Sequence, residues 1–529
     1  MLLIIALLLI VIIYYLLFKP LNYWKEKNVP YTRAVPIFGN TWPVVFRKLS
    51  SAEVNLKLCQ DHADKRYFGM HHFTTTTLLV QDPELIKKIT VKEFDAFPEH
   101  RSFIPADVDP LWNKNLFAME GGERWHQMRA TLSPSFTSNK MKTMFALMKE
   151  CSSQFSSFYL KKGGTVTIEL KDAFSRFTND VIATAGFGVK CDSLEEPRNE
   201  FYLMGRELTN FQGWKGLIFM LNLFVPTIAK LLRLPLFNKS VSDFFRSIVR
   251  ETIKIREEQN ITRPDMIHLL MQARAGQLKH EKEVSAPEAG FAAVEESEIG
   301  KNENKRKFGI TNEDITAQVL LFFFAGFDSV STMMCYAVYE LALQPEIQKR
   351  LQIEVDQGFS KCEDDLTYDA LMSMKYLDQI ISETLRKWPS FIATNRRCVR
   401  PFKIEPVKPE ESELYLETGS VISIPIYAIQ RDARYYPNPE KFDPERFSEQ
   451  NKDKIVPYTY LPFGAGPRNC IGSRFALMEG KLIIAELIRK FEFIVVEKTQ
   501  IPIVLSKTNF NPIPDEGFWI GLKPRMTQA

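Results

Sequence analysis

The sequence Pro462-Phe-Gly-Ala-Gly-Pro-Arg-Asn-Cys-Ile-Gly472 decides the fold, because three glycines and two prolines crowd into one short stretch. This composition predicts a shaped loop, with glycines able to take positive φ. The apolar spacing from Phe475 to Ile488 predicts a helix directly afterwards. Cys470 therefore lies on a turn that feeds a helix N-terminus, where the helix dipole and free N–H groups favour a thiolate. Such a thiolate suits a soft metal; the alternative is a buried structural cysteine.

The pattern Phe463-x-x-Gly466-x-Arg468-x-Cys470-x-Gly472 resembles the haem-binding loop of the cytochrome P450 family. The resemblance implies that the cofactor is haem b and that Cys470 is the proximal thiolate ligand of its iron, a ligand that favours O–O cleavage. It also implies that Phe463 shields the thiolate and that Arg468 pairs with a haem propionate. Gly466 belongs to the same cofactor-binding set.

Composition excludes several other classes of protein. The chain has 529 residues, a net charge of +4 and 45% hydrophobic residues, as expected of a large globular protein. The weak charge and the lack of a nucleic-acid motif argue against a nucleic-acid partner. Seven scattered cysteines argue against a disulfide framework and for a reducing compartment. By length alone about three domains are expected, but the family folds such a length into one body, mainly α with a small β region.

The amino end predicts a membrane anchor. Leu2 to Phe18 carries no charge, and with Met1 it makes a helix of roughly 27 Å, close to the ~30 Å hydrocarbon core. A cleaved signal peptide is the alternative, but a basic start and a small-residue cleavage site are both missing. Lys25, Lys27 and Arg33 follow the run, which places them on the cytosolic side of the endoplasmic reticulum membrane. The expected parts are an N-terminal transmembrane helix over 1–18, a basic, proline-rich hinge over 19–40 and a haem-thiolate monooxygenase domain over 41–529.

Trp125 and Arg129 are four residues apart, so on a helix they share one face. A surface stack of the two side chains is the alternative. Together with Leu-Ser-Pro-Ser-Phe at 132–136 they resemble the family's C-helix, in which both residues donate to a haem propionate. Alignment with the family makes Arg396 a third propionate partner.

Thr311-Asn-Glu-Asp314 predicts a capping box at the start of a helix. The stretch from Ile315 to Leu343 is apolar on nearly all sides, which predicts that this helix is buried. Its middle reads Ala325-Gly-Phe-Asp-Ser329. A mid-helix glycine costs ~1 kcal/mol against alanine, and a buried Asp must be paired, neutral or beside water. Helix packing with a satisfied Asp is the alternative. The family resemblance implies that Asp328 delivers protons and that Ser329, in place of the usual Thr, supplies the hydroxyl.

Three further motifs follow the family's order. Glu383-x-x-Arg386 and Pro-Glu-Arg446-Phe resemble its structural ion-pair triad, although such pairs on their own are usually solvated. Gln430 stands where many members carry His. Thr508-Asn-Phe510 resembles the hairpin tip that touches substrate.

The chain as a whole resembles a microsomal cytochrome P450 of the insect, xenobiotic-metabolising type. This implies insertion of one O₂ atom into an apolar small molecule, with electrons from an NADPH-dependent cytochrome reductase, or in addition cytochrome b5. The chain itself carries no nucleotide-binding motif, so the electrons come from another chain. Basic residues such as Arg124, Lys140 and Lys142 are candidates for docking that partner. Two alternatives stay open: a reductase-independent haem-thiolate isomerase or dehydratase, and a non-enzymatic haem-thiolate ligand binder.

Overall fold

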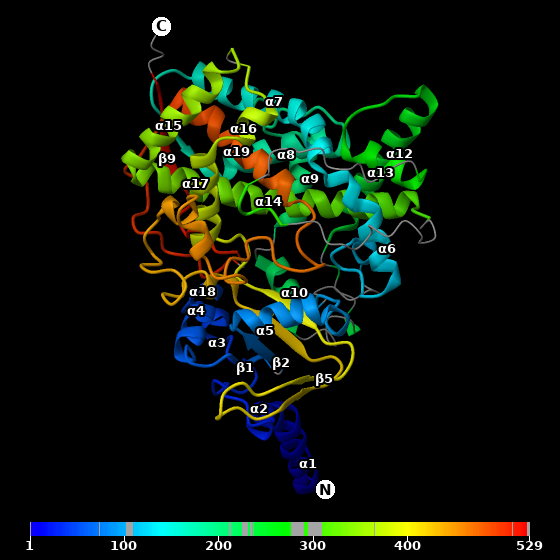
Figure 1. Ribbon diagram of the computed structural model, residues 1–529. Helices are drawn as coiled ribbons and strands as arrows, with labels where there is room; N and C mark the ends of the chain where they lie inside the picture. Colours follow the sequence, from blue (N-terminus) through cyan, green and yellow to red (C-terminus); the bar gives the residue numbers. More distant parts are fainter. Residues whose placement is uncertain are drawn as a thin grey trace.

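The computed structural model is mainly helical with small sheets, which confirms the predicted fold class for the body of the chain (Figure 1). It describes residues 2–73, 75–101, 109, 111–210, 213–224, 231–232, 235, 237–276, 290–294, 309–363, 365–509 and 511–525. In Figure 1 the long helices fill the larger, upper part, and the N-terminal elements with the first sheet form the lower part.

The longer helices build the body around one central helix. They are α1 (Leu2–Ile13), α4 (Ser51–Asp61), α6 (Glu123–Leu132), α7 (Ser138–Lys161), α8 (Leu170–Ile182), α9 (Glu200–Thr209), α10 (Gly213–Phe224), α12 (Lys239–Gln259), α13 (Met266–Arg274), α14 (Asn312–Leu343), α15 (Pro345–Ser360), α17 (Lys375–Lys387) and α19 (Ser473–Lys490). Short helices connect them: α2 (Tyr23–Glu26), α3 (Trp42–Val45), α5 (Pro83–Lys87), α16 (Tyr368–Met372) and α18 (Ile426–Ile429).

The strands form three small sheets. The first has the order β1 (Tyr67–His72), β2 (Thr75–Val80), β7 (Val421–Ile424) and β4 (Thr394–Arg397), with β2 and β7 parallel and the other pairs antiparallel. The second has the antiparallel order β3 (Val166–Glu169), β9 (Trp519–Pro524) and β8 (Phe491–Ile494). The third pairs β5 (Phe402–Ile404) with β6 (Leu414–Leu416). Sheet one brings Arg396 on β4 into the interior.

α14 is the buried central helix that the sequence predicts. The Thr311 side chain accepts from the Asp314 N–H while the Asp314 carboxylate accepts from the Thr311 N–H, so the predicted capping box is present. The helix packs against α8 on one side and against α12, α17 and α19 on others. Phe323 on α14 stacks within an aromatic cluster with Phe327 and Phe201. An apolar helix on all sides is stable here because neighbouring helices cover it.

The amino end differs from the predicted continuous spanning helix. α1 has 12 residues and ends at Ile13, and Tyr14–Phe18 forms a π-helical turn. At 1.5 Å per residue α1 alone covers only about 18 Å. Among the described residues the one helix long and apolar enough to cross a membrane is α14, and most of it is buried in the core. α1 extends from the lower end of the body in Figure 1, with Leu3 and Leu7 exposed.

The segment over 19–40 lies against the first sheet. The buried Trp24 indole donates to the carbonyl oxygen of Met70 at 3.0 Å. A Cβ on Gly69 would come within 2.2 Å of the Trp24 ring, so glycine is required for this close approach. The contact orients the amino end relative to the body.

The predicted ion-pair triad forms. Glu383 accepts from Arg386 at 2.7 and 2.8 Å, with both side chains fully buried, and Arg446 Nε lies 3.5 Å from its carboxylate. Burial raises the pKa of Glu383, and its bonds to Arg386 oppose that rise. Gln430 joins the same region, because its amide donates to the carbonyl oxygens at the end of α17 and accepts from the Leu461 N–H at 2.8 Å. Gln430 therefore connects α17 to the chain directly before residues 462–472, the loop that carries Cys470 and is called the cysteine loop below.

Candidate active site

The cysteine loop is a closed turn. The Cys470 N–H donates to the Phe463 carbonyl oxygen at 2.9 Å. Gly464 and Gly466 have φ of 75° and 70°, as the sequence predicts. A Cβ on Gly466 would lie 1.9 Å from the Thr90 carbonyl oxygen, so a larger residue would push the loop away from its neighbour. The backbone therefore requires glycine at 466.

The loop feeds α19 as predicted, but two details differ from expectation. Gly472, the residue before the helix, has φ of −92°, so it does not use the left-handed region. Burial raises the pKa of Cys470, while the backbone of Gly472 and the charge of Arg129 oppose the rise. The protein groups alone therefore do not make the thiolate the favoured form. A metal ion does so when the sulfur binds it, because a coordinating thiol is deprotonated outright.

Cys470 is the one exposed cysteine of the seven, all of which the structure describes. The surroundings of its sulfur are nevertheless crowded enough for burial to dominate the pKa of the thiol. An exposed residue whose thiol has crowded surroundings is expected where a side chain faces an internal space. This separates Cys470 from an inert structural cysteine, which packs out of reach.

Two buried guanidinium groups lie beside the loop. Arg468 donates to the backbone oxygens of Pro98, Leu116 and Met119 at 2.7 to 3.0 Å. Arg396 donates to the Asn395 oxygen at 2.8 Å, and its Nε is buried with no hydrogen-bond partner. Both residues come from segments more than 70 positions apart in the sequence.

Neither guanidinium has an ion-pair partner among the residues that the structure describes. Burial, and next the charge of Arg396, lowers the pKa of Arg468; burial also lowers the pKa of Arg396. His100 Nδ1 lies 3.4 Å from the Arg396 guanidinium, and burial and the charges of both arginines hold the pKa of His100 well below the ordinary value. Buried cations need an anion. The carboxylates of haem propionates fit this set of donors, and His100 is a member that the sequence did not reveal.

Trp125 and Arg129 share one face of α6 as predicted, and both are buried. The Trp125 indole donates to the Leu116 oxygen at 3.2 Å, and its ring lies 4.1 Å from the Arg468 guanidinium. Arg129 donates to the backbone and side-chain oxygens of Asn469 at 3.0 and 2.6 Å. In this structure α6 therefore holds the loop and orients Arg468. Nothing in the sequence pointed to Asn469.

The middle of α14 shows two different faces. Gly326 faces α8, where a Cβ would lie 3.0 Å from Ile182, so its small size has a packing reason. Ala325 is exposed although it belongs to a helix that is otherwise mostly buried. The Ser329 hydroxyl, one turn later on the same face, donates to the Ala325 oxygen at 2.5 Å. This face presents a small side chain and a hydroxyl to accessible space.

Asp328 is held on two sides. Lys171 on α8 lies 2.8 Å from one carboxylate oxygen, and the Asn511 amide donates to the other at 2.6 Å. The Lys171 ammonium also donates to the Asp328 carbonyl oxygen at 2.9 Å. Asn511 directly follows the predicted hairpin tip, of which Phe510 lies outside the described residues. The partners are 157 and 183 positions away from Asp328, so no local pattern could have found them.

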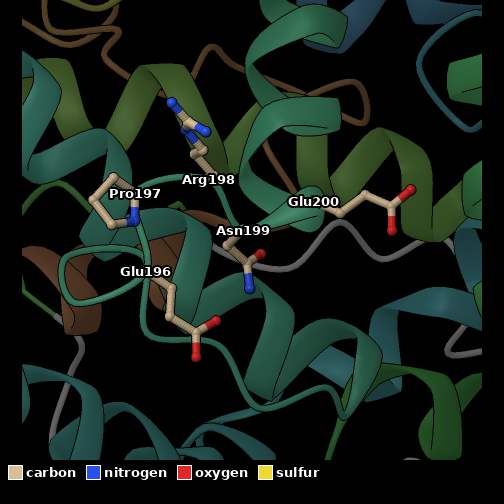
Figure 2. Close-up of a pocket in the computed structure, with 5 residues that line it drawn as sticks. All are labelled: Glu196, Pro197, Arg198, Asn199 and Glu200. Atoms are coloured by element: carbon tan, nitrogen blue, oxygen red, sulfur yellow. The ribbon is translucent and has the colours of Figure 1, made fainter.

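A surface hollow of about 590 Å³ lies elsewhere, at the segment that enters α9 (Figure 2). Its lining comes from five consecutive residues, Glu196 to Glu200, whose side chains point in different directions in Figure 2. It brings together no groups from distant segments. The candidate functional site of this structure is the region of Cys470, the buried arginines and α14.

Comparison with known proteins shows which family the chain is similar to. The family model described as Cytochrome P450 matches residues 30–519. The chain is 46% identical to Cytochrome P450 9e2 of Blattella germanica, over 96% of this chain and 95% of that protein. It is 38% identical to Probable cytochrome P450 9f2 of Drosophila melanogaster, over 95% of both. The predicted resemblance to insect members of the family is confirmed.

Proposed function

Because the chain belongs to the cytochrome P450 family of haem-thiolate monooxygenases, we propose that it oxidises apolar small molecules, xenobiotics or endogenous lipophiles. One atom of O₂ enters a C–H bond of the substrate to give an alcohol. The other atom leaves as water, with two electrons from NADPH, which becomes NADP⁺, and two protons. The single observation that carries this proposal is Cys470 on its glycine-shaped loop beside buried arginines that have no carboxylate within ion-pair distance among the described residues.

The proposed haem-binding residues have distinct tasks. Cys470 would bind the iron, and Gly466 and Phe463 shape the loop that presents the sulfur. Arg396 and Arg468 would bind the propionates, while Trp125 and Arg129 hold Arg468 and the loop in place. The bound haem supplies the iron at which O₂ is reduced.

Asp328 and Ser329 are proposed to manage protons. The Ser329 hydroxyl donates its hydrogen bond to the Ala325 oxygen, so its lone pairs are left to accept a hydrogen bond from the accessible side. Lys171 holds the Asp328 carboxylate towards α8. If the carboxylate leaves Lys171, it can pass protons together with the Ser329 hydroxyl. Replacing Asp328 by Asn should lower turnover about 100-fold, since positioned acid–base groups contribute at least that much. Unchanged turnover with intact haem binding would remove Asp328 from the mechanism.

We further propose that residues 1–18 anchor the chain in the endoplasmic reticulum membrane, with segment 19–40 as connector and 41–529 as the cytosolic catalytic domain. The exposed apolar side chains of α1 and the basic residues after it support this. The proposed electron donor is an NADPH-dependent cytochrome reductase, with cytochrome b5 as a second donor.

The first test is the difference spectrum of the reduced, carbon-monoxide-bound protein. A long-wavelength Soret band that is lost in Cys470→Ala is expected of a thiolate-ligated haem. A well-folded, haem-loaded protein that lacks the band would overturn the proposal. NADPH consumption with reductase then separates a monooxygenase from an isomerase, a dehydratase or a ligand binder, which need no such electrons.

A further inference from the structure

A short apolar segment of the long connection between α13 and α14 lies on the protein surface next to the cysteine loop. This segment, Gly290–Val294, has Ala292 only 3% exposed. The Phe291 ring contacts the rings of Phe447 and Tyr460, with centroid distances of 5.2 and 5.6 Å. Aromatic pairs at these separations attract each other beyond simple burial. The segment is therefore seated on the body.

The backbone of the segment is fitted to its place. The Phe291 N–H donates to the Asp378 carboxylate at 3.0 Å, and the same carboxylate pairs with Lys481 at 2.8 Å. Gly290 has φ of 119°, and a Cβ there would lie 1.9 Å from an Asp378 oxygen. Only glycine allows this approach. The turn at Gly290 and the ring of Phe291 are therefore both fitted to this place on the body.

The segment ends at the functional site. Val294 lines the same small cavity as Cys470, Ile471 and Arg474, the last two on either side of the helix start. Electron transfer slows steeply with distance, so an electron donor must approach the iron where protein between surface and ligand is thinnest. Val294 and Cys470 line one cavity, so the surface around that cavity offers a short route to the ligand.

We propose that Gly290–Val294 is an intrachain cover over the face where the electron donor docks, and that the donor must displace it. This inference rests on the proposed function, because it assumes that electrons arrive from a partner chain. Electron-transfer complexes have small interfaces, so five residues cover a sizeable part of one. Phe291 is 36% exposed, and its release breaks one hydrogen bond to Asp378 and two ring contacts.

Two single variants release the cover by different routes. Phe291→Ala removes the ring that fills the aromatic contact, and Gly290→Ala keeps the ring but clashes with Asp378. A face that is free only part of the time weakens apparent binding by that fraction. Both variants should therefore lower the reductase concentration that gives half-maximal turnover, by about five-fold if the cover is seated four-fifths of the time.

The measurement uses full-length protein, titrated with reductase at saturating NADPH. Phe46→Ala is the matched control, because Phe46 is also exposed and loses one edge-on aromatic contact, to Phe38 at 5.1 Å. Phe46 directly follows α3, in the lower part of Figure 1. It should leave the half-saturating concentration unchanged. Turnover supported by an organic peroxide, which needs no reductase, should be equal in all four proteins.

An unchanged half-saturating concentration in both release variants would overturn the cover. An increase would also overturn it, since the segment would then be part of the surface that the donor binds. A wild-type chain that forms product with peroxide but takes no electrons from reductase would instead overturn the proposed electron supply. The inference and the proposed function therefore fail in distinguishable ways.

Discussion

Two of the clusters of buried arginines in the described part of the chain are neutralised differently. Arg386 has a carboxylate of its own, because Glu383 lies 2.7 Å away and is as completely buried. Arg468 belongs to the cysteine loop and Arg396 lies beside it. Both donate mainly to backbone oxygens, with no carboxylate in ion-pair distance among the described residues. The first cluster is complete within the chain. The second is complete only with an anionic ligand.

The difference separates structure from function. A closed ion pair fixes one arrangement of the chain, and breaking it costs stability. An incomplete cluster raises the free energy of the protein alone, as the lowered pKa values of Arg396 and Arg468 show. That free energy is recovered when an anion binds. Residue type and burial are the same in both clusters, so the partner decides the role.

The largest effect is expected when the closed cluster is opened. Glu383→Gln leaves Arg386 charged and fully buried without its carboxylate, so the free energy of unfolding should fall by about 3–5 kcal/mol. Urea unfolding measures the change. Glu445→Gln is the matched control, because its pair with Arg350 is exposed and should contribute less than about 1 kcal/mol. Equal losses in the two variants would make the buried pair no different from a surface pair.

An intermediate effect is expected in the open cluster. Arg396→Met removes one cation, so the unfolding free energy should change little while haem is held more weakly. A lost charge-assisted hydrogen bond of about 1.5–3 kcal/mol predicts haem release ten-fold or more faster. Transfer of haem to an excess of another apoprotein measures that rate. A large loss of stability with normal haem retention would assign Arg396 to structure.

The smallest effect concerns pH. Burial and the charges of Arg396 and Arg468 hold the pKa of His100 well below 6.5. Below pH 6.5 the unfolded chain therefore binds a proton at His100 that the folded chain does not. The free energy of unfolding consequently falls as the pH falls. Between pH 7.5 and 5.5 the wild type should lose about 1.4 kcal/mol more than His100→Gln. Parallel pH profiles for the two proteins would show that His100 is not shielded from protons.

Much of the fold could be predicted because its signals are local. The capping box at Thr311 and the apolar run after it predict α14, and the glycines before Cys470 predict its turn. The predicted triad of Glu383, Arg386 and Arg446 also forms. The amino end could be predicted less well, because hydropathy does not reveal that regular helix ends at Ile13.

The sequence by itself determined the cysteine loop, the central helix α14 and the family, since these depend on neighbouring residues whose spacing is visible in the chain. Only the tertiary structure decided which side chains contact each other. Lys171 and Asn511 bind Asp328, Asn469 binds Arg129, and Phe291 packs against Phe447. The physical reason is that hydrogen bonds and ion pairs depend on distance in space. Folding brings together side chains that the sequence keeps far apart.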